Sequence, residues 1–341
     1  MVKLDERKFM ILQAIIDDYI LTASPVGSRT ISKKSGVGFS PATIRNEMSD
    51  LEELGYLAQP HTSAGRVPSL KAYRLYVDEL LKREELSPEE SQRILSHMTS
   101  RSNQVEEVIR RAAMALSDLT NYTSVIVAPH IETLRIARIQ FVPVTEGKAL
   151  MVVVTSAGIV KDALIRIPKD LDAEYLFRIS QMLTEQLADL TVSQVRQKFA
   201  EMFRDMNENR RFMADVMDVL ENRLREEQSA DVMVGGRVNM LHYPEYSDAE
   251  KAMGLLSVLE NREKLYPILT NGNGMEFTIR IGPENRLPEL SDCSVITATY
   301  RVDEKTTGTM GIIGPVRMQY ARVMSVLGFM GRTLEEILSG Q

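Results

Sequence analysis

The sequence predicts an α+β multidomain protein, and three patterns along its 341 residues support this fold class. Short amphipathic helices separated by glycine-containing turns occupy the N-terminal quarter. Runs rich in Val and Ile, which favour strands, follow in two groups, over 124–167 and over 276–313. A helix-rich segment over 195–269 separates these two groups. This order predicts a helical N-terminal domain and then an α/β domain that is interrupted by an insertion.

The first domain contains a window without acidic residues, from Tyr19 to Asn46, although the chain has a formal net charge of −6. The window includes four cations, which are Arg29, Lys33, Lys34 and Arg45. Excluding acids from one part of an acidic chain produces a local positive field, and the natural partner of such a field is a polyanion. The window therefore indicates a nucleic-acid contact.

Three helices are predicted around this window, the first of them over 4–19. Ser28 is suited to cap a short second helix over 29–35. Ser40 is suited to cap a third helix over 41–54, because the Pro that follows it fits the first helical position. A glycine-containing turn separates the second helix from the third, which predicts a helix-turn-helix.

The third helix has an apolar stripe at helical spacing, formed by Ile44, Met48, Leu51 and Leu54. The opposite side carries small or hydrogen-bonding residues: Ala42, Arg45, Asn46 and Ser49. Arg45 suits guanine and Asn46 suits adenine in the major groove, so these four residues are the candidates for reading bases. The alternative is an ordinary solvated helix surface.

A hairpin is predicted after the third helix, with a strand over 56–60, a polar tip over 61–65 and a basic return over 66–68. This element reads as the wing of a winged helix and lies within a second acid-free window, from Leu54 to Val77. Side chains of the helices and the wing that suit phosphate oxygens are Arg29, Lys33, Lys34, Ser40, Thr43, His61, Thr62, Ser63 and Arg66.

The predicted domain boundaries follow from composition and pattern. The domains are a DNA-binding domain over 1–83, connecting helices over 84–121, an α/β domain over 122–194 and 270–341, and an insertion over 195–269. Ser87 and Glu90 have the capping-box spacing that opens the connecting helices. An amphipathic helix over 173–187 is predicted to cover the first group of strands, and a long helix over 315–338 is predicted after the second group.

No catalytic residue, metal ligand or cofactor is predicted. The four histidines are scattered and have no ligand spacing with the single cysteine, Cys293. No glycine-rich sequence of the phosphate-cradling type occurs, and no apolar run is long enough for a membrane span. The N-terminus lacks the pattern of a signal peptide, so the expected compartment is the cytoplasm.

Several segments resemble the bacterial heat-inducible transcription repressor family HrcA. The N-terminal matches are Ile11–Tyr19, Pro25–Ile31, Ser40–Met48 and Leu51–Arg66, and later landmarks are Gly235–Asn239 and Gly311–Met318. The resemblance implies a GAF-like domain interrupted by a helix-rich inserted dimerising domain. It also implies a homodimer that represses chaperone operons at an inverted-repeat operator called CIRCE. The active form would be maintained by the chaperonin GroEL, with derepression on heat stress. The alternative is a metabolite-responsive repressor that uses a GAF-like ligand pocket.

Overall fold

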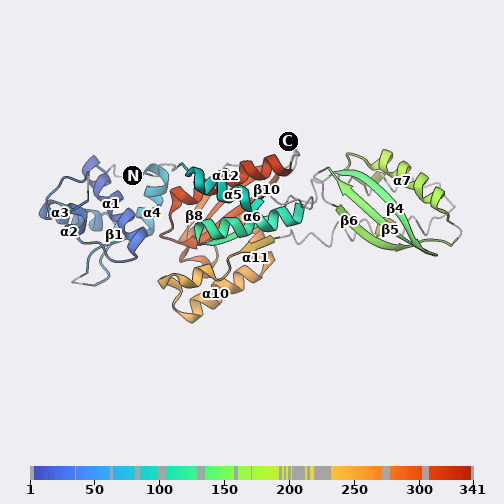
Figure 1. Ribbon diagram of the computed structural model, residues 1–341. Helices are drawn as coiled ribbons and strands as arrows, with labels where there is room; N and C mark the ends of the chain where they lie inside the picture. Colours follow the sequence, from blue (N-terminus) through green and yellow to red (C-terminus); the bar gives the residue numbers. More distant parts are fainter. Residues whose placement is uncertain are drawn as a thin grey trace.

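A computed structural model describes residues 4–34, 36–61, 64–80, 85–98, 105–128, 135–156, 160–169, 171–191, 194–195, 197–198, 201, 212, 216–218, 232–270, 277–301 and 307–338. The chain has an elongated arrangement with the N-terminal helices at one end and a five-stranded sheet in the middle (Figure 1). A separate three-stranded sheet lies at the other end. The architecture is mixed helix and sheet, as the sequence predicts.

The N-terminal unit contains the predicted helices and the predicted hairpin. Its elements are α1 (Glu6–Thr22), α2 (Ser28–Ser32), α3 (Pro41–Glu53), β1 (Leu57–Ala58), β2 (Val67–Pro68) and α4 (Leu70–Leu75), which continues into a π-helical turn, η1 (Tyr76–Leu80). Asp5 caps α1 by accepting a hydrogen bond from the backbone N–H of Lys8 at 2.8 Å. The buried side of α1 is aliphatic and comprises Ile11, Leu12, Ile15, Ile16 and Ile20.

The central sheet has the order β7-β3-β10-β9-β8, and every neighbouring pair in it is antiparallel. Its strands are β3 (Thr123–Val127), β7 (Val232–Gly235), β8 (Phe277–Ile281), β9 (Cys293–Arg301) and β10 (Thr307–Pro315). All five residues of β3 are buried, as expected for a strand that is covered on both faces.

Helices cover both faces of the central sheet. They are α5 (Pro88–Met98), α6 (Val105–Thr120), α10 (Ala249–Glu260), α11 (Arg262–Thr270) and α12 (Tyr320–Leu338), with short 3-10 turns η3 (Asn239–His242), η4 (Pro244–Tyr246), η5 (Gly282–Asn285) and η6 (Pro288–Leu290). On β10, Met310 approaches Gly331 of α12, whereas the next residue, Gly311, approaches Leu269 of α11. Because successive strand residues face opposite sides, α12 and α11 lie on opposite faces.

The third unit is built from β4 (Ile136–Thr145), β5 (Lys148–Thr155), β6 (Val160–Arg166) and α7 (Ala173–Leu187), and its sheet has the order β4-β5-β6. Buried and less buried residues alternate along β5, so α7 covers one face of this sheet. The outer edge of β4 is bonded to α7. Ser180 accepts from the N–H of Phe141 at 2.9 Å, and Thr184 both accepts from and donates to the backbone of Ile139.

The structure divides the chain differently from the predicted domains. The prediction joined 122–194 to 270–341 and treated 195–269 as the insertion. Only β3 from the first range pairs with β10, whereas β4, β5 and β6 form a separate sheet with its own apolar cluster. From the predicted insertion, β7 pairs with β3, and α10 and α11 belong to the central cluster. Sheet topology therefore places the interruption between β3 and β7, because Val and Ile content predicts strands but not their partners.

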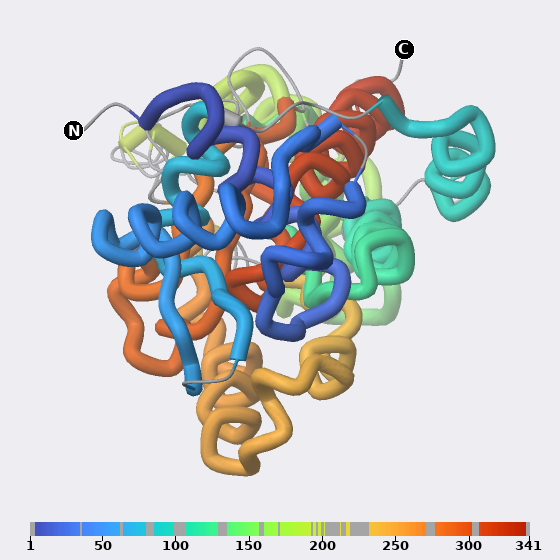
Figure 2. The backbone as a smooth tube through the Cα atoms, turned by 90° about the vertical axis from the view of Figure 1, so that its left-hand side faces the viewer, coloured from blue at the N-terminus to red at the C-terminus, as the bar shows by residue number. Residues whose placement is uncertain are grey.

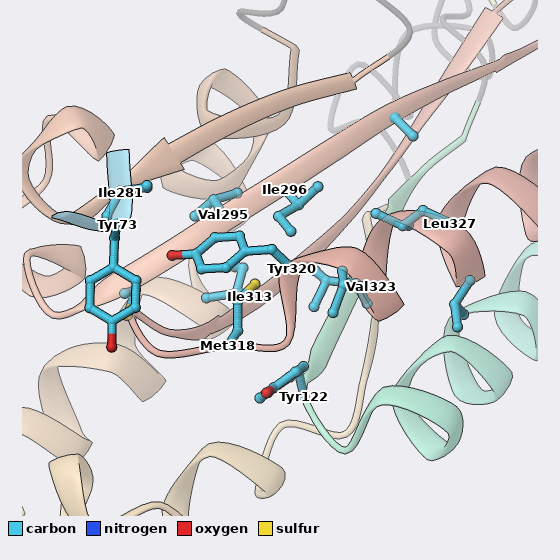
Figure 3. Close-up of a cluster of buried hydrophobic side chains, with 14 of the residues drawn as sticks. Tyr73, Tyr122, Ile281, Val295, Ile296, Ile313, Met318, Tyr320, Val323 and Leu327 are labelled. Atoms are coloured by element: carbon cyan, nitrogen blue, oxygen red, sulfur yellow. The ribbon is translucent and has the colours of Figure 1, made fainter. Parts of the chain in front are cut away.

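One apolar cluster runs from the N-terminal unit into the central sheet. Tyr73 of α4 and Tyr320 of α12 are 2% and 1% exposed, and their ring centroids lie 6.3 Å apart. Figure 3 shows Tyr73 beside Tyr320, with Ile281, Val295 and Ile313 from the sheet around them. The N-terminal unit is thus packed onto the sheet, and the two share a core.

A close backbone approach joins β7 to α6. Gly236 follows β7 with a φ of 61°, and a Cβ at this position would overlap the Ser117 hydroxyl. The Asn239 amide donates to the same hydroxyl at 2.9 Å, and the Thr123 hydroxyl donates to the Gly236 carbonyl at 3.1 Å. Glycine is required here both by the positive φ and by the absence of space for a side chain.

We therefore expect Gly236→Ala to lower the free energy of unfolding by about 1–3 kcal/mol, measured by urea denaturation. Gly254→Ala is the matched control, because Gly254 lies within α10 and the nearest atom to an added Cβ is 3.7 Å away. The control should be neutral or stabilising by up to about 1 kcal/mol. Equal losses in the two variants would contradict this account of Gly236.

Candidate nucleic-acid interface

Helix α3 begins at a well-formed cap. The Ser40 hydroxyl accepts a hydrogen bond from the Thr43 N–H at 3.1 Å and lies 2.9 Å from the Thr43 hydroxyl. Pro41 occupies the first helical position, and Gly55, with a φ of 77°, follows the end of the helix. The predicted cap and helix position are therefore correct. The start of α2 differs, because Ser28 is a buried residue within the helix and Gly27 precedes it without a side-chain cap.

The outward side of α3 has the predicted composition. Ala42, Arg45, Asn46 and Ser49 are all exposed, whereas Ile44, Met48 and Leu51 are buried. Leu54, which was predicted to complete the buried stripe, is half-buried at the end of the helix. The exposed side lies at the end of the molecule opposite the three-stranded sheet (Figure 1). No part of the described chain covers it.

A backbone bridge holds the hairpin against α2. The N–H of Val26 donates to the Arg66 carbonyl at 2.8 Å, and the N–H of Arg66 donates to the Val26 carbonyl at 2.9 Å. A Cβ on Gly65 would overlap the Val26 carbonyl, so only glycine permits this approach. Figure 2 shows the hairpin projecting from the N-terminal unit, on the side that faces the viewer. The bridge was not predicted, and Gly65 before Arg66 is the sequence signal that could have indicated it.

The bridge creates a hollow of about 470 Å³ between α2, α3 and the hairpin. Three arginines that are distant in sequence line it: Arg29, Arg45 and Arg66. Met48 and Gln59 contribute to its walls, and the backbone of Gly65 lies on the hairpin side. Cationic residues that line one concavity favour an anion there. The sequence predicted each cation but not their convergence.

The predicted phosphate-contacting cations differ in their pairing. Lys34 lies 2.8 Å from a carboxylate oxygen of Asp18, and Arg66 lies 2.8 Å from one of Glu52. Arg29, Lys33 and Arg45 are exposed, and none of them forms an ion pair with another described residue. The acids that pair Lys34 and Arg66 come from helices α1 and α3. The unpaired charge is thus concentrated on α2 and the beginning of α3.

The remaining candidates are placed as follows. His61 is exposed at the hairpin, and Ser40 and Thr43 are bonded to each other at the beginning of α3. Thr62 and Ser63 lie outside the described residues.

Ion pairs also join α3 to α1. The Lys8 ammonium lies 2.8 Å from Glu47 and 3.0 Å from Asp50. Hydrogen bonds to these two carboxylates, Glu47 first, raise the pKa of Lys8 above its ordinary value. Since Glu47 is 8% exposed, this charge is satisfied within the unit and is not part of the free surface.

The described residues contain no cluster of three or more His, Cys, Asp or Glu side chains arranged to bind a metal ion. Cys293 is buried, and burial raises the pKa of its thiol to about 12, so it is neutral at ordinary pH. In the part of the chain that the structure describes, every helix is too short or too polar to span a bilayer.

Relatives of this chain match nearly its whole length. A protein from Ruminiclostridium cellulolyticum is 43% identical over 340 residues, which cover 98% of each chain. A protein from Pelotomaculum thermopropionicum is 42% identical over 338 residues, covering 98% of this chain and 97% of the relative. Both are named heat-inducible transcription repressor HrcA. A crystal structure of a hypothetical protein, 25% identical, superposes with a TM-score of 0.68 over 99% of both chains.

These relatives and the exposed cationic surface place the chain in the class of heat-inducible transcription repressors. Residues 106–324 match the family model described as the HrcA protein C-terminal domain. The chain belongs to the HrcA family.

Proposed function

We propose that this chain is a winged-helix repressor that binds, as a homodimer, to an inverted-repeat operator of the CIRCE type upstream of chaperone operons. The observation that carries this proposal is the exposed polar side of α3 beside a hollow lined by Arg29, Arg45 and Arg66. The central sheet and its helices would be the GAF-like domain that the resemblance implies. The protein would act in the cytoplasm, where the operator lies.

The proposed docking follows from the shape of the surface. Helix α3 enters the major groove, where Ala42, Arg45, Asn46 and Ser49 meet base edges. The hairpin then meets the neighbouring groove of the duplex. The DNA backbone between the two grooves therefore passes over the hollow lined by the three arginines. A phosphate there would be contacted by Arg29 of α2, with Lys33 directly after the end of the same helix. Lys34 and Arg66 would contribute less, because carboxylates already neutralise part of their charge.

Substitutions should separate base reading from phosphate contact. Asn46→Ala should cost on the order of 1–3 kcal/mol per half-site and relax the preference for one base, because a bidentate contact is lost. Lys33→Ala should weaken binding to all sequences alike. It should also lower by about 1 the salt slope, which is the steepness with which log affinity falls with log salt concentration. The measurement is binding to the operator and to base-substituted operators over a range of salt concentrations.

Lys251→Ala is the matched control, since Lys251 is an exposed lysine on α10, outside both the N-terminal unit and the three-stranded sheet. It should leave both affinity and salt slope unchanged. If Asn46→Ala preserves the whole profile of base preference, Asn46 does not lie in the reading surface.

The homodimer is proposed to form through the open face of the three-stranded sheet. Three aligned residues on this face, Val142, Leu150 and Leu164, form a row across β4, β5 and β6. Val142 and Leu164 are 43% and 56% exposed, and Val160 on the same face is 52% exposed. An apolar sheet face of this kind is typical of an interaction surface.

Two opposite charges at the edges of this face are placed to pair with a second copy. Arg138 lies on β4 at one edge, and Asp162 lies on β6 at the other. A two-fold axis along the strands would bring the Arg edge of one copy over the Asp edge of the other. Such a symmetric contact uses the same surface on both copies, and the dimer then matches an inverted repeat.

We expect Leu164→Lys to convert the dimer to monomers, because two like charges would be buried at the centre of the contact. Sedimentation over a range of protein concentrations measures the effect. Met253→Lys, at a residue 70% exposed on α10, is the control and should leave the dimer intact. Unchanged sedimentation of Leu164→Lys would exclude this face as the dimer surface.

Heat would relieve repression through loss of the active fold, which a GroEL-type chaperonin restores. Domains are stable by only ~5–15 kcal/mol, so a modest rise in temperature unfolds a substantial fraction. Occupation of the chaperonin by other unfolded chains would then leave the repressor inactive. This cycle is carried over from the family resemblance.

The cycle predicts that heated protein regains operator binding only when chaperonin and ATP are both added. A gel shift on an inverted-repeat duplex measures the recovery, with chaperonin without ATP as the control. Full spontaneous recovery without chaperonin would contradict this part of the proposal.

A further inference from the structure

Arg317 connects the core domain to the last turn of α1. It lies in the turn between β10 and α12, and its side chain is only 10% exposed. Its Nη1 group donates to the Ile20 carbonyl at 3.0 Å. Its Nε and Nη2 groups donate to the two carboxylate oxygens of Glu245, the second at 3.2 Å. These contacts bring together residues that are 297 and 72 positions apart in the chain.

The contact with Ile20 supplies a charge that α1 lacks. The last turn of a helix leaves backbone carbonyls without helical partners and carries partial negative charge. No basic residue of α1 itself lies in that turn, and the helix ends at Ala23 in a left-handed conformation. The guanidinium of Arg317 therefore provides the cation at the C-terminal end of α1 from a different domain.

On the core side, Arg317 is held firmly. Glu245, on η4, forms the bidentate pair, and the Tyr243 ring lies 5.4 Å from the guanidinium carbon. The Tyr243 ring is stacked on Tyr122, with centroids 5.4 Å apart. Because the guanidinium is fixed by an ion pair and an aromatic face, the end of α1 has a defined position relative to the central sheet.

The position of α1 determines the position of α3. The two helices pack through buried aliphatic side chains, and the ion pairs of Lys8 with Glu47 and Asp50 join them on the surface. A second fixed point lies on α4, where Arg74 donates to the Ile279 carbonyl and to Glu284, both at 3.1 Å. Two separate polar contacts therefore set the orientation of the N-terminal unit, and Arg317 provides the one at α1.

We infer that Arg317 is a positioning residue for DNA recognition. Together with Glu245 and the Ile20 carbonyl it forms what we term the Arg317 anchor, which sets the separation and angle of the two α3 helices in the dimer. The anchor thereby determines which spacing between operator half-sites is accepted. This inference rests on the proposed function, since it concerns binding of a dimer to an inverted repeat.

The test compares full-length wild type with Arg317→Ala on a single half-site duplex and on inverted repeats of varied spacing. Affinity for the half-site should stay within about twofold, because no group that faces DNA is altered. Affinity for the optimally spaced repeat should fall about tenfold, because a loosely held second unit has a lower effective concentration at its half-site. The loss of affinity that follows a change in the spacing between half-sites should be smaller than in wild type.

Two milder variants keep the test valid if Arg317→Ala fails to fold. Arg317→Lys removes the bidentate pair, and Glu245→Gln removes the charge but leaves the bond to Ile20. Both should shift spacing tolerance in the same direction, by a smaller amount. Arg322→Ala is the matched control, because Arg322 pairs with Glu90 and contacts the Leu119 carbonyl, all outside the N-terminal unit. It should retain the wild-type spacing penalty.

A folded Arg317→Ala protein with the wild-type spacing penalty overturns the inference. If wild type binds no duplex at all, the proposed function fails, and hydrogen exchange still tests the anchor. Amides in the last turn of α1 should exchange faster in Arg317→Ala than in wild type or Arg322→Ala. Equal exchange in all three proteins overturns the inference without reference to DNA.

Discussion

The packing of the N-terminal unit onto the central sheet is the interaction on which the rest of the structure depends. Tyr320 lies at its centre, and its hydroxyl donates to the Val316 carbonyl at 2.6 Å and lies 2.7 Å from the Ser294 hydroxyl. These bonds allow the Tyr320 ring to be buried without an unsatisfied polar group, whereas the buried Tyr73 hydroxyl has no hydrogen-bond partner among the described residues. Because one apolar cluster serves both parts, unfolding of either part exposes the surface of the other. Sensitivity to temperature is therefore shared between the N-terminal helices and the sheet.

Much of the fold could be predicted because it depends on short-range patterns. The cap at Ser40, the helix that follows it and the turn at Gly55 are all set by neighbouring residues, and all three are present. Strands were recognised by their Val and Ile content, but their grouping was not. The partner of β3 on one side is β10, nearly two hundred residues later, and on the other side β7. Such pairings depend on packing between distant segments, which periodicity does not report.

In the candidate site, too, sequence patterns do not report contacts between distant segments, and this affects which charges are paired. The absence of acids near Arg29 and Lys33 in sequence corresponds to exposed, unpaired cations in the described structure. For Lys34 and Arg66, the absence of acids nearby in the sequence does not mean an unpaired charge. Asp18 and Glu52 reach these two cations from helices that border the window. Where helices cross, residues that are distant in the sequence lie close together in space. An acidic protein thus keeps a small cationic surface, and part of its positive charge stabilises the unit instead.

The bonded edge of β4 has a consequence for association between copies of the chain. An open strand edge with free backbone groups recruits edges from other molecules and leads to aggregation. Ser180 and Thr184 occupy the backbone groups of Ile139 and Phe141, and Pro143, further along β4, has no N–H to offer. At this edge, copies of the chain cannot extend the sheet strand by strand. The hydrogen bonds to α7 thus remove one route to intermolecular β-sheet formation.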